Sequence, residues 1–268
     1  NENIFSVGDF MKKWKQLKRW KKALLLLALI LLAAGIGCGI YISDDYPADA
    51  AALEVIAYPE AGISVSETED GAILFEPENP LAGMIFYPGG KVQYEAYAPL
   101  MEACAEKGIL CVLLHMPGNL AVLDPNAADG IPDDFPEISR WYLAGHSLGG
   151  AMAASYVSSH TEEYAGLILL AAYSTGDLSQ SGLSVLSVYG SEDGVMNRDS
   201  YEKYRGNLPA DFTELIIPGG CHAYFGCYGP QNGDGTPSIT RDAQIQLTAE
   251  AIAACVREAA ATSSSAGQ

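Results

Sequence analysis

The sequence predicts an α/β fold, with a mainly parallel central sheet covered by helices on both faces. One apolar helix is predicted to precede this domain in the sequence. From residue 83 onward, runs of β-forming residues alternate with stretches of helical periodicity, which is typical of a parallel sheet. The run 109–115 is continuously apolar, as expected for a strand covered on both faces. The chain of 268 residues is long enough for one such domain.

The apolar helix is predicted over residues 23–42, which form an uncharged stretch. At 1.5 Å per residue it spans about 30 Å, the thickness of a bilayer's hydrocarbon core. Seven basic residues precede it, and Asp44 and Asp45 follow. The positive-inside rule then predicts a single-pass protein of the cell membrane, with residues 1–22 cytoplasmic and the rest outside. A cleaved signal peptide, a lipidated Cys38 and a buried soluble helix are the alternatives.

The net charge of the chain limits the classes of partner that we expect. The formal net charge is −18, from 15 Lys and Arg against 33 Asp and Glu. Nucleic-acid binding needs clustered basic side chains, so we expect no nucleic-acid partner.

The remaining elements follow from local patterns. Residues 43–52 are predicted to be a linker, 53–262 the folded domain and 263–268 a disordered tail. Residues 62–68 and 71–77 predict a hairpin, because β-forming residues flank an Asp-Gly turn. Residues 116–139 contain four prolines, so any helix there is short or broken. The other predicted strands are 53–59, 83–90, 109–115, 140–145, 167–173, 183–190 and 212–220, and the predicted helices are 94–107, 148–160, 198–206 and 238–260, the last capped by Ser238.

A serine lies where a predicted strand turns into a predicted helix. The segment reads GHSLGG, with Ser147 between Gly145 and Gly149. A sharp strand-to-helix turn leaves room only for small residues two positions before and after the serine. Ser147 is therefore the candidate nucleophile, and an incidental turn is the alternative.

A serine hydroxyl needs a base, and the base needs a carboxylate to orient it. His222 follows the last predicted strand, between glycines that let the chain turn, and is the best candidate base. Asp193 follows the strand 183–190 and is the candidate carboxylate, with Glu192 as the alternative. Serine, aspartate and histidine then occur in the chain order typical of α/β-hydrolases.

The transition state also needs hydrogen-bond donors for an oxyanion. The N–H of Leu148 is one candidate, and Gly90, followed by Lys91, is the candidate for the other. Side chains expected to line the substrate site lie on the loops near these groups: Tyr87, Lys91, His146, Tyr224 and Phe225.

The motifs FYPGG (86–90), GHSLGG (145–150), GSEDGV (190–195) and GGCHAYFG (219–226) make the chain similar to α/β-hydrolase fold proteins. It most resembles compact, lidless bacterial members related to dienelactone hydrolases and small esterases, some of them membrane-anchored. The resemblance implies the α/β-hydrolase fold and the triad. One departure is Tyr87-Pro88, where the family has histidine-glycine before the oxyanion loop.

These observations predict a membrane-anchored serine hydrolase that cleaves a small-molecule carboxylic ester through an acyl-enzyme, with no cofactor and no metal. The short connection between strands 167–173 and 183–190 predicts an open, shallow pocket. A peptidase, an acyltransferase and a non-catalytic binding module are the alternatives on this fold. Cys221 and Cys227 flank the histidine loop, and outside the cytosol a disulfide between them is a candidate.

Overall fold

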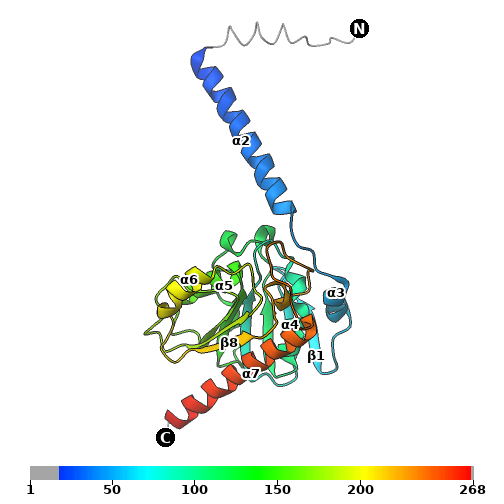
Figure 1. Cartoon of the computed structure of the whole chain (residues 1–268), viewed down its shortest axis with the longest axis vertical. Coiled ribbons are helices and arrows are strands. Elements are labelled where there is room, and N and C mark those ends of the chain that lie inside the picture. Colours follow the sequence, from blue (N-terminus) through cyan, green and yellow to red (C-terminus); the bar gives the residue numbers. More distant parts are fainter. Residues whose placement is uncertain (1–17, 267–268) are drawn as a thin grey trace. The chain divides into compact units, whose positions relative to one another are not determined.

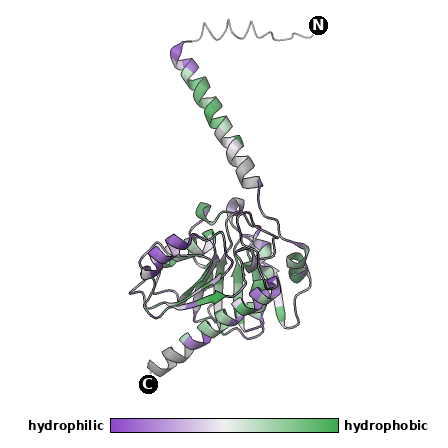
Figure 2. Cartoon of the chain, in the orientation of Figure 1, coloured by the Kyte–Doolittle hydropathy of each residue, from purple (hydrophilic) through white to green (hydrophobic). Residues whose placement is uncertain are grey.

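The computed structural model describes residues 18–266. The described chain divides into two compact units, of which the first ends at Asp44 and the second begins at Asp45. In the first unit, helix α2 (Arg19–Ser43) carries an exposed apolar stretch over Arg19–Gly37 that is long enough to cross a membrane. Figure 2 shows a hydrophilic start of this helix followed by mainly hydrophobic colour. The predicted helix 23–42 lies within α2, and residues 1–17 of the predicted cytoplasmic segment lie outside the described residues.

The second unit is built on one eight-stranded sheet in the order β1-β2-β4-β3-β5-β6-β7-β8. The first two strands form the predicted antiparallel hairpin, and β2 also pairs antiparallel with β4. All the later pairs are parallel. The strands are β1 (Ile63–Glu67), β2 (Ile73–Pro77), β3 (Ala82–Tyr87), β4 (Ile109–Leu113), β5 (Trp141–His146), β6 (Gly166–Leu170), β7 (Ser184–Gly190) and β8 (Thr213–Ile217).

Helices cover both faces of this sheet (Figure 1). Side chains alternate along the strands, so Met84 and Phe86 of β3 face the α4 and α7 side while Ile85 and Tyr87 face the α5 side. The mainly parallel sheet with two apolar faces is the predicted architecture. The helices of this unit are α3 (Ala50–Ala57), α4 (Ala98–Ala105), α5 (Leu148–Val157), α6 (Arg198–Tyr204) and α7 (Arg241–Ala266).

Residues 53–59 do not form the predicted first strand, because most of them belong to helix α3. The side chain of Asp49 accepts a hydrogen bond from the N–H of Ala52 at 3.2 Å and caps this helix. Three consecutive alanines at 50–52 favour the helix further. The compact unit accordingly begins at Asp45, and residues 45–52 are part of it instead of a linker.

The C-terminal helix differs from the prediction at both ends. It begins at Arg241, and Thr240 accepts a hydrogen bond from the N–H of Ala243, so Thr240 occupies the capping role predicted for Ser238. It continues to Ala266, so residues 263–266 of the predicted disordered tail are helical, and residues 267–268 lie outside the described residues. Between residues 116 and 139 the described chain forms only short 3₁₀ turns, as its prolines predict.

Candidate active site

Ser147 lies at the sharp turn between β5 and α5. Its φ is 52° and its ψ is −120°, a backbone conformation that residues other than glycine rarely adopt. Its N–H donates to the carbonyl oxygen of Leu170 on the neighbouring strand β6 at 2.9 Å, which holds the turn against the sheet. Strained residues of this kind persist only where their surroundings enforce them, and they cluster at functional sites.

The two flanking glycines are required by close backbone packing. A Cβ on Gly145 would lie 2.6 Å from the carbonyl carbon of Gly149. A Cβ on Gly149 would lie 2.2 Å from the carbonyl oxygen of Tyr87 at the end of β3. Both separations are shorter than real side chains tolerate, so helix α5 can start against the sheet only because these positions lack a side chain.

Asp193 and His222 form a buried pair beyond the carboxyl ends of β7 and β8, at the sheet edge where Ser147 follows β5. Nδ1 of His222 lies 2.9 Å from Oδ2 of Asp193, and the side chains are 1% and 0% exposed. The main-chain N–H groups of Val195 and Met196 donate to Oδ1 of the same carboxylate at 2.9 and 2.8 Å. The aspartate is therefore fixed by its own loop while it orients the imidazole.

The electrostatics of this pair favour a charged aspartate. Burial tends to raise the pKa of Asp193, but the hydrogen bond and charge of His222 and the two N–H donors outweigh it, and the pKa lies below its ordinary value. An ionised Asp193 accepts the Nδ1 proton of His222. The lone pair of a neutral His222 then lies on Nε2, where a base needs it.

Nε2 of His222 is buried and has no hydrogen-bond partner among the described residues. The ring centroid of His222 lies 4.4 Å from that of His146, the residue directly before Ser147, so the imidazole lies beside the turn. The structure thus joins His222 to Asp193 by a hydrogen bond but not to Ser147. In unliganded enzymes such contacts are often loose and tighten only with substrate.

His146 does not line an open site. It is 1% exposed, and its Nδ1 lies 2.8 Å from the hydroxyl of Tyr97, which also accepts the N–H of Gly89 at 3.1 Å. Burial, followed by the charge of His222, moves the pKa of His146 well below its ordinary value. His146 therefore packs beneath the turn and connects it to the loop after β3.

Two other predicted lining residues are also buried. Tyr87 is fully buried, and its hydroxyl donates to the carbonyl oxygen of Pro125 and accepts the N–H of Ala128, so it braces the segment after β4. Phe225 is fully buried in the core on the α7 side. Both predictions were wrong about direction: Tyr87 ends β3 and Phe225 lies in the loop after β8, but both side chains point into the protein.

The loop after β3 contains the candidate oxyanion donors. The N–H of Gly89 donates to Tyr97, and the N–H of Lys91 donates to the carbonyl oxygen of Asn119 at 2.7 Å. The N–H of Gly90 has no partner among the described residues. A Cβ on Gly90 would lie 2.8 Å from the Leu148 side chain, so Gly90 packs directly against the start of α5. Of the two candidates on this loop, only Gly90 has an uncommitted N–H.

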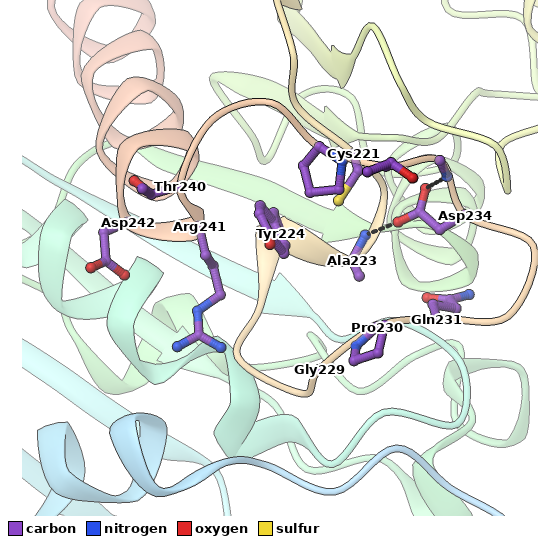
Figure 3. A pocket seen from close by; sticks show the side chains of 13 residues that line it. Cys221, Ala223, Tyr224, Gly229, Pro230, Gln231, Asp234, Thr240, Arg241 and Asp242 are labelled. Atoms are coloured by element: carbon purple, nitrogen blue, oxygen red, sulfur yellow. Dashed lines mark hydrogen bonds between the residues drawn. The ribbon is translucent and has the colours of Figure 1, made fainter.

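Asp234 is a site residue that the sequence analysis missed. Its Oδ1 accepts the N–H of His222 at 3.0 Å and that of Gly194 at 3.2 Å, and its Oδ2 accepts the N–H of Ala223 at 2.8 Å. Figure 3 shows the carboxylate beside the chain at Ala223. One side chain therefore ties the histidine loop to the loop of Asp193. The only sequence signal is Asp234 between glycines in NGDGT, which reads as an ordinary turn.

A cavity of about 720 Å³ is lined in part by Cys221 and Ala223, the two chain neighbours of His222 (Figure 3). Tyr224 lines it, together with Asp234 and the start of α7, while Ser147 and His222 do not. Tyr224, predicted to line the substrate site, thus lines a cavity to which neither Ser147 nor His222 contributes. Lys91 is half-buried next to Gly90.

Cys221 and Cys227 do not form the candidate disulfide. Both are buried free cysteines, and burial raises the pKa of each thiol to about 12. The histidine loop is held instead by Asp234 and by Gln244, whose side chain exchanges two hydrogen bonds with the main chain of Cys221. The described residues contain no group of three or more His, Cys, Asp or Glu side chains arranged to hold a metal.

A parallel sheet, a strained serine at a strand-to-helix turn and a buried Asp–His pair at the same edge define an α/β-hydrolase. The chain belongs to the alpha/beta hydrolase family, whose model matches residues 83–246, more than half of the chain. No curated protein sequence matches it.

Solved structures share the fold at low sequence identity. Est1E from Butyrivibrio proteoclasticus is 15% identical, with a TM-score of 0.54, and the match covers 75% of this chain and 100% of Est1E. A dienelactone hydrolase of Anabaena variabilis is 17% identical, with a TM-score of 0.51 and coverage of 70% and 96%. Carboxyl esterase 2 of Tuber melanosporum is 10% identical, with a TM-score of 0.54 and coverage of 80% and 91%.

Proposed function

We propose that the protein is a serine hydrolase that cleaves carboxylic esters through an acyl-enzyme on Ser147. The observation that carries the proposal is the buried hydrogen bond between Asp193 and His222 beside the strained Ser147 turn. In a serine hydrolase such a pair orients the histidine so that its free Nε2 takes a proton from the neighbouring serine.

In the proposed reaction, Oγ of Ser147 attacks the ester carbonyl while Nε2 of His222 takes the hydroxyl proton. The tetrahedral intermediate collapses, the bond to the alcohol oxygen breaks, and His222 returns its proton to the leaving alcohol. A water molecule then attacks the acyl-enzyme and gives a proton to His222. The bond between the acyl carbon and Oγ of Ser147 breaks, His222 returns the proton to Oγ, and the carboxylic acid is released. Asp193 stays ionised throughout and stabilises the imidazolium.

The N–H groups of Gly90 and Leu148 are the proposed oxyanion donors. The two residues pack against one another, Gly90 has an uncommitted N–H, and Leu148 is the first residue of α5, whose N–H has no partner within the helix. The helix start also favours negative charge. Removing one such donor typically costs about 10²- to 10³-fold in turnover.

A small or exposed acyl group suits this site best. The connection between β6 and β7, residues 171–183, contains no helix, so no helical cap covers the site from that segment. Leu120 and Leu148 lie against Gly90 and provide apolar surface beside the proposed oxyanion position. Est1E, which shares the fold, has been solved with ferulic acid bound, an example of a compact acid in a related scaffold.

Hydrolysis of p-nitrophenyl acetate and of longer acyl esters tests this proposal, with Ser147→Ala as the control. Turnover that disappears in the control and declines with chain length supports an esterase for small acyl groups. Faster cleavage of peptide amides than of any ester would favour a peptidase, and acyl transfer to an added alcohol in preference to water would favour an acyltransferase. No turnover of any of these substrates would contradict the enzyme proposal.

We further propose that α2 anchors the protein in the cell membrane, with the hydrolase domain outside. The exposed apolar stretch and the basic residues before it support this assignment. Membranes from cells that produce the full chain should retain it through carbonate extraction, and protease added from outside should digest the domain. Release of the domain by carbonate would contradict the anchor.

A further inference from the structure

The loop that presents Gly90 contains one strained residue, Lys91, which contacts a second strained residue, Asn119, in the segment after β4. Lys91 has a φ of 62° and Asn119 a φ of 55°, both in the left-handed region that favours glycine. The N–H of Lys91 donates to the carbonyl oxygen of Asn119 at 2.7 Å. Such conformations need external contacts to hold them, so the direction of the Gly90 N–H depends on whatever supports this pair.

Residues 45–49, which we call the strap, provide that support. The N–H of Tyr46 donates to the carbonyl oxygen of Lys91 at 2.7 Å, and the N–H of Gln93 donates back to the carbonyl oxygen of Tyr46 at 3.0 Å. The side chain of Asn119 donates to Oδ2 of Asp45 at 2.7 Å. The strap therefore bonds to both members of the strained pair, one through its main chain and the other through the Asp45 carboxylate.

The same strap contacts the segment that follows His222. The N–H of Asp49 donates to the carbonyl oxygen of Cys227 at 2.8 Å. The hydroxyl of Tyr46 accepts the N–H of Asn232 at 3.3 Å, and its ring lies 5.7 Å from that of Tyr228. The strap thus connects the loop of the proposed oxyanion donor to the loop of the proposed base.

We propose that the strap is a positioning element of the active site, with Asp45 as its main positioning residue. This inference rests on the proposed function. By holding Lys91 and Asn119, the strap keeps the Gly90 N–H directed at the oxyanion, so the segment that leaves helix α2 determines how fast Ser147 is acylated. Its loss lowers the rate of the chemical step more than it weakens substrate binding, because the donor acts mainly on the transition state.

The test compares Asp45→Ala, Asp45→Asn and Asp211→Ala in the full chain in detergent. Asp211 is an exposed aspartate that precedes β8, at the opposite edge of the sheet from Ser147. With p-nitrophenyl acetate we expect Asp45→Ala to lower kcat about 10-fold while KM changes less than about twofold. Asparagine at this position keeps an oxygen for the Asn119 amide, so Asp45→Asn should recover most of the rate, and Asp211→Ala should match the wild type.

Asn119→Gly removes the same hydrogen bond from its other partner, because glycine tolerates the left-handed backbone and lacks the side chain that donates to Asp45. This variant replaces Asp45→Ala if the latter unfolds at the assay temperature. The double variant Asp45→Ala/Asn119→Gly should have a kcat no lower than that of the slower single variant, because both substitutions remove the same hydrogen bond between Asn119 and Asp45.

Wild-type kcat in Asp45→Ala, or fully multiplicative losses in the double variant, would overturn the role of the strap while leaving the esterase proposal intact. A wild-type chain that neither hydrolyses esters nor reacts with a fluorophosphonate would instead remove the proposed function itself.

Discussion

Nδ1 of His222 lies 2.9 Å from Oδ2 of Asp193, in a pair that solvent hardly reaches. Glu192, the neighbouring carboxylate, is exposed and accepts a hydrogen bond from the Ser191 hydroxyl instead. The two carboxylates that the sequence leaves as alternatives therefore have separate surroundings, and only Asp193 faces the imidazole.

Replacing Asp193 with asparagine should lower kcat for p-nitrophenyl acetate by roughly 10³- to 10⁴-fold, because the amide no longer holds the Nδ1 proton and the correct tautomer is lost. Glu192→Gln is the matched control and should stay within about twofold of the wild type. Steady-state kinetics of the two variants measure this. If kcat fell further in Glu192→Gln than in Asp193→Asn, the carboxylate that orients His222 would be Glu192, and the assignment to Asp193 would be wrong.

The Asp234 carboxylate accepts main-chain hydrogen bonds from both loops of the pair. Asp234→Ala should lower the free energy of unfolding by about 1–3 kcal/mol, because the partly buried N–H groups of His222 and Ala223 lose their acceptor. It should also reduce kcat more than it raises KM. Asp234→Asn keeps one oxygen and should lie between the wild type and the alanine variant.

Asp242→Asn is the control for Asp234, since Asp242 is exposed and lines the same cavity. Urea denaturation and kinetics of the three variants check this prediction. If Asp234→Ala and Asp242→Asn behave alike, Asp234 has no special role in the loops.

The strain at Ser147 predicts a difference between two inactive variants. Ser147→Gly and Ser147→Ala both remove the nucleophile, but only glycine adopts a φ of 52° at ψ −120° without cost. Ser147→Gly should therefore be more stable than Ser147→Ala by about 1–2 kcal/mol in urea denaturation. Equal stability of the two variants would argue against strain at the turn.

Because His146 is buried with a lowered pKa, we expect the free energy of unfolding to depend on pH. Its pKa in the folded protein lies well below that of the unfolded chain, which is near 6.5, because burial and the charge of His222 disfavour the protonated form. Below about pH 6.5 the unfolded chain takes up a proton that the folded chain does not. Stability should then fall by up to about 1.4 kcal/mol per pH unit between pH 6.5 and 5.

His146→Asn keeps an acceptor for the Tyr97 hydroxyl and removes this titration. Its stability should fall less steeply than that of the wild type when urea denaturation is repeated at pH 7, 6 and 5. Parallel curves for the two proteins would contradict the assignment.

The strand-end positions of Ser147, Asp193 and His222 could be predicted because each follows a local pattern: an apolar run that ends in small residues. The helix at Ala50–Ala57 could not, since 53–59 reads equally well as a strand and the deciding cap at Asp49 precedes it. The predicted directions of the Tyr87 and Phe225 side chains were wrong because the sequence indicates that a residue lies at or after the end of a strand, but not to which side its side chain points.

Asp234 and the strap were missed for a different reason. Most of their partners are main-chain groups in other loops, up to 186 positions away along the chain, and no sequence pattern marks a carboxylate or a tyrosine that bonds to a distant peptide group. The supports of a site are less visible in sequence than its reactive side chains.

Fluorophosphonate labelling followed by peptide mass spectrometry tests the central claim most directly, because the reagent phosphonylates only an activated serine. The account predicts one adduct per chain, located on Ser147, that forms at least about 10²-fold more slowly in Asp193→Asn and is absent from Ser147→Ala. No adduct on the folded wild-type protein, or an adduct on another serine, would contradict it.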